Sequence, residues 1–246
     1  MRRLQVTSYR PQATGHKPQA TIRDVRPAAI LVPLGAALAS AGIVLYYGSR
    51  QPSAIVSDRT TPGEKIVSIN NEPRHPVSPL MVREAALIAR KTAPFFKLKD
   101  AHGIDIQIGG TGSKPQFIYF ILEGCPCSLD AQPLFNRMYQ RYKDRVDFIG
   151  VINAGKAKAL DFAGETTTLH PIVCDEHLTV IKAYGAKQST YNAVVRPDGT
   201  VERMWPGYSQ SYLHELNSVL ARLTGTKEEP FDAAYAPVKP ASGCVF

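Results

Sequence analysis

The stretch QFIYFILEGCPCS, Gln116–Ser128, decides the fold. After Gln116 it continues as six aromatic and aliphatic residues without a break, which is typical of a strand buried on both faces. The run ends in EGCPCS, and the proline at position 126 is of the kind favoured in the first turn of a helix. The sequence therefore predicts a buried strand over 116–122 that passes directly into a helix beginning near Pro126.

A second buried strand is predicted on the far side of that helix. Apolar residues recur at one-turn spacing up to Tyr142, so the helix is expected over about 126–142. The run VDFIGVIN, Val146–Asn153, then repeats the buried-strand pattern. A strand–helix–strand unit implies a parallel pair with a right-handed crossover.

Outward from this unit, the remaining pattern predicts helices alternating with short strands. Ser78 and Pro79 indicate the start of a helix that ends at about Lys91. The RPDG sequence at 196–199 predicts a type I turn between two strands, and Trp205 and Tyr208 are expected to pack this hairpin against the last helix. Together these patterns predict an α/β fold, a mixed sheet with helices on both faces. The other expected elements are helices over 156–164, 178–184 and 211–223 and strands over 172–173, 192–195 and 200–205.

Several segments resemble a redoxin domain of the AhpC/TSA type. APFFKL at 93–98, then Gly103, then a strand that ends at a Cys-Pro turn resemble the opening of that domain. RPDGTV at 196–201 resembles its later hairpin, and WPGYS at 205–209 resembles the end of that hairpin. The family includes peroxiredoxins and exported thiol–disulfide oxidoreductases. The resemblance covers about 93–224 and implies a thioredoxin-like mixed sheet with flanking helices, with Cys125 as the attacking cysteine and no cofactor.

The position of Cys125 favours nucleophilic chemistry independently of the resemblance. Unpaired N–H groups and a partial positive charge at a helix start stabilise a thiolate. A thiol whose pKa is lowered in this way is a nucleophile near neutral pH. The alternative is a buried or palmitoylated thiol without chemistry.

Cys127 departs from the family, whose oxidoreductases usually carry CxxC. Here the cysteines form Cys125-Pro126-Cys127, and Ser128 stands in the fourth place. A disulfide across one residue is strained, and strained disulfides tend to be oxidising. Cys127 therefore resolves Cys125 directly, or Cys125 works alone, or the pair binds a metal or has no role. We take Cys125 and Cys127 as the candidate catalytic residues.

Two further departures leave the substrate open. Peroxiredoxins place a threonine three residues before the attacking cysteine, where this chain has Leu122. Thioredoxin-like members have a cis-proline at the position of Thr190. Hydroperoxides and protein thiols or disulfides are both retained as partners.

The two other cysteines are weaker candidates. Cys174 is interpreted as a small buried residue. Cys244 lies near the end of a tail of about 20 residues, which at ~3.3 Å each is long enough to cross a small domain. Cys244 is either a mobile resolving cysteine or part of an unconstrained tail.

No structural metal is expected, because no two histidines are closely spaced. His170 and His177 are interpreted as surface or loop residues. Two alternative functions remain. Copper handling uses cysteines at the same junction in this fold, and soft thiolates suit Cu(I). A non-catalytic binding module is also compatible, since fold does not fix function.

The N-terminal region predicts export and membrane anchoring. Ala28–Tyr47 holds no charged residue and is long enough to cross a bilayer as a helix. Six basic residues precede it, which favours a cytoplasmic N-terminus. A cleaved signal peptide and a buried core helix are the alternatives. The expected parts are a cytoplasmic tail (1–27), a transmembrane helix (28–47), a linker with a short helix (48–92), the redoxin domain (93–224) and a C-terminal tail (225–246).

The charge distribution excludes a nucleic-acid footprint on the main domain. The formal net charge is +8, but residues 1–50 hold seven of the 29 Lys and Arg residues and one of the 21 acidic ones. The basic excess therefore belongs to the N-terminal tail. We predict a membrane-anchored, extracytoplasmic (periplasmic) thiol-dependent oxidoreductase; the pattern does not determine its oligomeric state.

Overall fold

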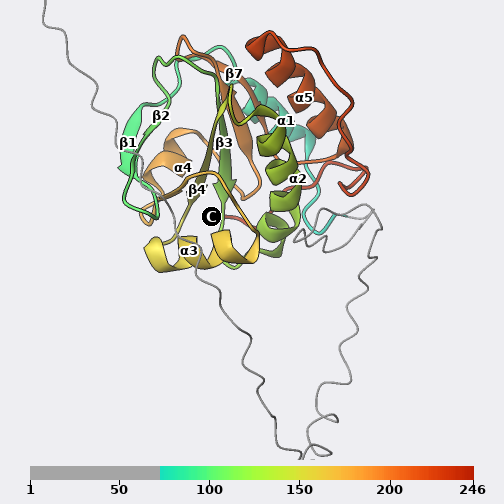
Figure 1. The fold of residues 1–246 in the computed structure, drawn as a ribbon. Helices are drawn as coiled ribbons and strands as arrows, with labels where there is room; N and C mark the ends of the chain where they lie inside the picture. The colour runs from blue at the N-terminus through green and yellow to red at the C-terminus, as the bar shows by residue number, and fades with distance from the viewer. Residues whose placement is uncertain (1–72) are drawn as a thin grey trace, which may run out of the picture. The chain divides into compact units, whose positions relative to one another are not determined.

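The computed structural model describes residues 73–246. Its main sheet has the strand order β5-β4-β3-β6-β7 (Figure 1). The central strand β3 pairs in parallel with β4 and antiparallel with β6, so the prediction that 116–122 lies at the centre of a mixed sheet is confirmed. The bounds are β3 Gln116–Ile121, β4 Asp147–Ile152, β5 Ile172–Cys174, β6 Asn192–Val195 and β7 Val201–Trp205.

Every residue of β3 is buried, which explains its unbroken apolar run. Phe117, Tyr119 and Ile121 belong to one core cluster, which also contains apolar residues of α2 and α5. Ile118 and Phe120 belong to a second cluster on the other face of the sheet. Alternate side chains of β3 thus hold both layers together, since successive residues of a strand point to opposite faces.

Helices cover both faces of the sheet. Figure 1 shows α2 and α5 on one side and α4 with the β1–β2 hairpin on the other. The long helix α2 has the predicted bounds, and α3, α4 and α5 agree with the predictions within two residues. The bounds are α2 Pro126–Tyr142, α3 Lys156–Glu165, α4 Thr179–Ala183 and α5 Gln210–Thr224.

The structure differs from the sequence predictions at the start of the domain. Helix α1, Pro79–Ala86, ends before Lys91, and Arg90 has a positive φ of 66° that a helix does not accommodate. The antiparallel hairpin of β1, Phe96–Lys99, and β2, Asp105–Ile108, was not predicted. Both strands are short and partly exposed, so they lack a strong apolar pattern.

The C-terminal tail packs on the domain. Helix α5 ends at Gly225, and the chain then returns with Phe231, Ala233, Ala236 and Ala241 buried in the core cluster of α2 and α5. Both backbone bonds of an antiparallel bridge join Ala241 to Tyr208. The expectation of an unconstrained tail is therefore wrong.

The hairpin after β6 packs against the last helix, as predicted. Trp205 is buried, and its indole N–H donates a 2.9 Å hydrogen bond to Glu215 of α5. Tyr208 is buried in the same cluster, where it also meets the tail.

The predicted cytoplasmic tail and transmembrane segment lie outside the described residues. Within residues 73–246, no helix combines the length and the apolar character that a bilayer crossing requires.

The contact between α2 and β3 gives a stability prediction. The Phe135 ring is buried, with its centroid 5.1 Å from that of Phe117 and 4.6 Å from that of Tyr119. We expect Phe135→Ala to lower the free energy of unfolding by about 3–5 kcal/mol, the usual cost of emptying such a site. Urea unfolding of the purified full chain measures this loss.

The matched control is the same substitution at an exposed phenylalanine. The side chain of Phe95 is 55% exposed, so Phe95→Ala is expected to change the free energy of unfolding by less than about 1 kcal/mol. Equal losses in the two variants would contradict the packing of α2 on β3.

Candidate functional site

The turn between β3 and α2 places Cys125 directly before the first residue of the helix. Gly124 has a φ of +72°, which turns the chain out of the strand, and Cys125 is the N-cap residue of α2. The Cys125 carbonyl accepts a 3.0 Å hydrogen bond from the Ser128 N–H, which closes the first turn. The Cys125 side chain therefore lies at the positive end of a 17-residue helix.

Hydrogen-bond donors converge on the Cys125 sulfur. The Ser189 hydroxyl donates across 3.2 Å and the Cys244 backbone N–H across 3.4 Å, while the Cys244 sulfur lies 3.2 Å away. A hydrogen bond from the Cys127 thiol is the largest influence, and it lowers the pKa of Cys125 far below its ordinary value. Burial opposes this, but the bonds from Ser189 and Cys244 add to the lowering. Cys125 is therefore the group that carries the thiolate.

Cys127 has the opposite character. Its hydrogen bond to Cys125 raises its pKa, and burial and the negative charge on Cys125 raise it further. It lies beside a small pocket that Asp130 and Tyr208 also line. Cys127 therefore stays protonated as a donor while Cys125 is ionised.

Ser128, in the fourth place of the motif, joins the helix to the strand. It is fully buried, and its carbonyl accepts a 2.9 Å hydrogen bond from the Tyr119 hydroxyl. Its own hydroxyl oxygen accepts from the Leu122 N–H at 3.3 Å. The residue that would be the second cysteine of CxxC thus has a structural role here.

The loop opposite Cys125 is strained at Thr190. This residue is buried with a φ of +67°, a region that β-branched residues rarely adopt. Its hydroxyl has no hydrogen-bond partner among the described residues. Backbone strain of this kind clusters at functional sites, and here it positions the neighbouring Ser189 beside Cys125.

A histidine joins the cluster from the start of the described chain. His75 Nε2 lies 3.5 Å from the Cys244 sulfur, and the His75 carbonyl accepts a 2.7 Å hydrogen bond from the Ser242 N–H. The site thus combines residues from the α2 start, the 189–190 loop, the tail and residue 75.

The remaining predicted residues lie elsewhere. Cys174 ends β5 and is only partly buried, which corrects its interpretation as a buried residue. This partial burial, together with the charges of Glu176 and Asp100, raises its pKa. His177 is exposed, and His170 lies in the loop before β5 as predicted, although its side chain is buried. Its Nε2 atom lies 3.0 Å from the Gln132 amide nitrogen, and burial lowers the pKa of His170 to about 4.

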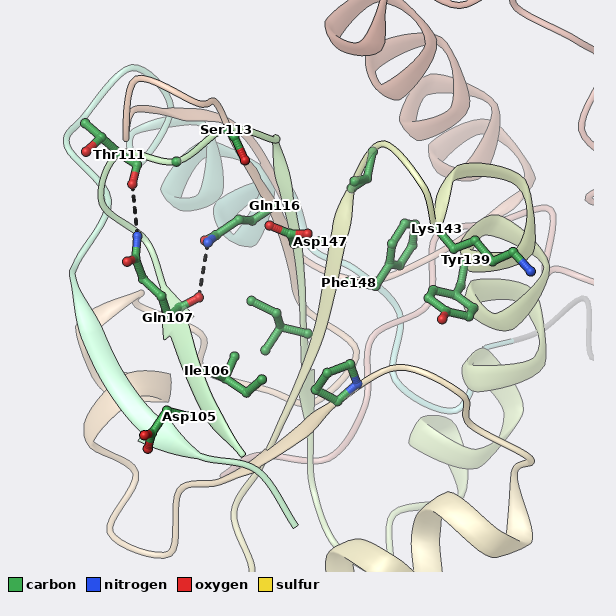
Figure 2. A pocket seen from close by; sticks show the side chains of 14 residues that line it. Asp105, Ile106, Gln107, Thr111, Ser113, Gln116, Tyr139, Lys143, Asp147 and Phe148 are labelled. Atoms are coloured by element: carbon green, nitrogen blue, oxygen red, sulfur yellow. Dashed lines mark hydrogen bonds between the residues drawn. The ribbon is translucent and has the colours of Figure 1, made fainter. Parts of the chain in front are cut away.

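A cavity of about 420 Å³ lies at the opposite end of the sheet and is separate from this cluster. Figure 2 shows that Gln116, Asp147 and Tyr139 line it, at the beginnings of β3 and β4 and on α2. The Gln116 amide is already bonded to the backbone of Gly109 and Gln107, so its role is structural. Among residues 73–246, no group of three or more His, Cys, Asp or Glu side chains has the arrangement of a metal site.

Sequence reasoning identified Cys125 and Cys127 but missed Ser189 and His75. Neither residue stands in a motif, and each lies more than 45 positions from Cys125 along the chain. Thr190, at the position where thioredoxin-like members have a cis-proline, is the sequence signal that lies nearest to Ser189.

Comparisons with known proteins agree with this architecture. The model of the AhpC/TSA family matches residues 89–204. A crystal structure of an uncharacterized conserved protein from Geobacillus kaustophilus is 19% identical, with a TM-score of 0.50 over 64% of this chain and 90% of that chain. A hypothetical protein from Sinorhizobium meliloti is 17% identical, with a TM-score of 0.50 over 64% and 92%.

A secreted Mycobacterium tuberculosis disulfide oxidoreductase is 19% identical, with a TM-score of 0.44 over 52% of this chain and 96% of that chain. The comparison with curated proteins found no match. At these identities, the two structures with a TM-score of 0.50 establish the thioredoxin-like fold alone. The family match covers residues 89–204 and shows that this part of the chain is similar to the AhpC/TSA family.

Proposed function

We propose that this protein is a thiol–disulfide oxidoreductase in which Cys125 is the nucleophile. The observation that carries the proposal is the convergence of donors on the Cys125 sulfur at a helix N-terminus. The Ser189 hydroxyl, the Cys244 N–H and the Cys127 thiol all stabilise its negative charge. Such a thiolate attacks a sulfur atom of a substrate disulfide, forms a mixed disulfide and expels the other sulfur as a thiolate.

Cys127 belongs to the proposed site as the donor that stabilises this thiolate. Its raised pKa suits a hydrogen-bond donor and makes it a poor attacking group. The Leu122 side chain offers no hydroxyl for a peroxide, so protein thiols and disulfides are the partners we propose.

We propose further that Ala28–Tyr47 anchors the domain outside the cytoplasm. The support is the uncharged run after six basic residues. An extracytoplasmic compartment is one in which disulfides form and persist, which suits a disulfide-exchanging protein.

The lowered pKa of Cys125 predicts an unusual pH profile. Because the thiolate persists until the pH falls to that lowered pKa, the rate of Cys125 alkylation should stay level below about pH 8.5, where an ordinary thiol is already protonated. Cys174, whose pKa is raised, should be alkylated only at higher pH. Mass spectrometry of iodoacetamide-treated full chain, peptide by peptide, measures both profiles.

Substitutions separate the roles of the cysteines. Cys125→Ser should abolish reduction of a disulfide substrate, and Cys127→Ala should shift the Cys125 alkylation profile to higher pH because it removes the main donor. Cys174→Ser is the matched control and should leave both properties unchanged. Full turnover by Cys125→Ser would show that the assignment is wrong.

The topology prediction concerns the full chain in a bacterial cell. An alkaline phosphatase fused after Phe246, which is active only outside the cytoplasm, should be active, since the basic residues hold the N-terminus inside. If instead only a reporter that works in the cytoplasm is active when fused after Phe246, the predicted orientation is wrong. If mass spectrometry finds a mature N-terminus near Ser40, the segment is a cleaved signal peptide and not an anchor.

A further inference from the structure

Residues Ala241–Phe246 run beside Cys125 and form isolated β-bridges at Ala241 and Val245; we call this segment the tail strand. The Gly243 N–H donates to the Ser189 carbonyl at 3.0 Å, and the Ser189 N–H donates to the Cys244 carbonyl at 2.9 Å. On the other side, the Ser242 N–H donates to the His75 carbonyl. Backbone bonds therefore hold Cys244 in place from two directions.

This pairing needs glycine before the cysteine. A Cβ atom at Gly243 would come within 1.8 Å of the Ser189 hydroxyl oxygen and 3.0 Å of the Ser189 Cβ. The close approach places the Cys244 sulfur 3.2 Å from the Cys125 sulfur, where a disulfide has about 2.05 Å. A small shift of the tail strand is enough to bond the two sulfurs.

We propose that Cys244 is the resolving thiol of Cys125, and that the tail strand occupies the place where the cysteine-bearing segment of a protein substrate docks. This inference rests on the proposed function and deepens it. The sequence left Cys127 and Cys244 as candidates for the resolving thiol. The inference selects Cys244 as the partner that forms the intramolecular disulfide with Cys125.

The reaction balances in two exchanges. Cys125 thiolate attacks the substrate disulfide, forms a mixed disulfide and releases the first substrate sulfur as a thiolate. Cys244 then loses its proton to His75 and attacks the Cys125 sulfur, and the second substrate sulfur leaves. The protein dithiol is oxidised by two electrons to a Cys125–Cys244 disulfide. The substrate gains these electrons and two protons, one of them from Cys244, and an external dithiol restores the protein.

The order of the two exchanges follows from the charge on Cys125. While Cys125 is ionised, its hydrogen bond with Cys244 and its negative charge both raise the pKa of Cys244. The mixed disulfide removes that charge. Cys244 therefore becomes easier to ionise only after the substrate has bonded to Cys125.

The position of the tail strand indicates the substrate class. The Cys125 side chain is buried, with the tail strand bonded to the same Ser189 backbone that faces it. An incoming disulfide reaches the sulfur only when the tail strand moves aside, and the Ser189 N–H and carbonyl are then open for another strand. The substrate that fits is an extended peptide segment with a small residue before its cysteine.

The first test uses oxidised glutathione, a small peptide disulfide, on the reduced full chain, with mass spectrometry of the trapped species. Wild type, Cys127→Ser and the control Cys174→Ser should each form the Cys125–Cys244 disulfide. Cys244→Ser should instead accumulate glutathione on Cys125. A Cys125–Cys127 disulfide in wild type and in Cys244→Ser would overturn the inference while keeping the proposed function. No glutathione on Cys125 in any variant would overturn both.

The second test loosens the tail strand without touching a sulfur. Gly243→Ala should displace the strand, so glutathione should bond to Cys125 about tenfold faster, which corresponds to about 1.4 kcal/mol of lost tail binding. The intramolecular disulfide should form more slowly in the same variant. The matched control is Gly164→Ala in α3, where a new Cβ meets nothing within 4 Å. Rates equal to wild type in Gly243→Ala would overturn the docking role of the tail strand.

Discussion

The whole site depends on one electrostatic balance at the Cys125 sulfur. Burial disfavours the charged form of a thiol, yet Cys125 is buried and has a lowered pKa. The hydrogen bonds from Cys127, Ser189 and the Cys244 N–H outweigh the loss of solvent. Without these donors the position at the helix start would have to offset the burial alone.

That balance requires several parts of the chain to be placed together. Ser128 fixes the helix start to the end of β3 through its bonds with Tyr119 and Leu122. The strained loop at Thr190 supplies the Ser189 hydroxyl. The tail supplies a backbone N–H and a second thiol. The buried packing of Phe231, Ala233 and Ala236 carries the tail to this point.

The same arrangement creates a conflict between stabilising the thiolate and exposing it. The strand that donates to Cys125 also covers it, so the proposed reaction requires a partner to displace a stabilising segment first. Local openings of this kind cost less than global unfolding, and binding segments are commonly the less stable ones. The tail strand is held largely by backbone bonds, so it suits such an exchange.

Local pattern in the sequence determined the sheet, the helix α2 and the position of Cys125. An unbroken run of aromatic and β-branched residues favours a buried strand, and proline is favoured in the first turn of a helix. The β1–β2 hairpin escaped prediction because its short, partly exposed strands carry little pattern. Only the tertiary structure decided which groups surround the sulfur. Ser189, Cys244 and His75 are distant in sequence, and backbone pairing between the tail and two loops, which leaves no periodic signal, brings them to Cys125.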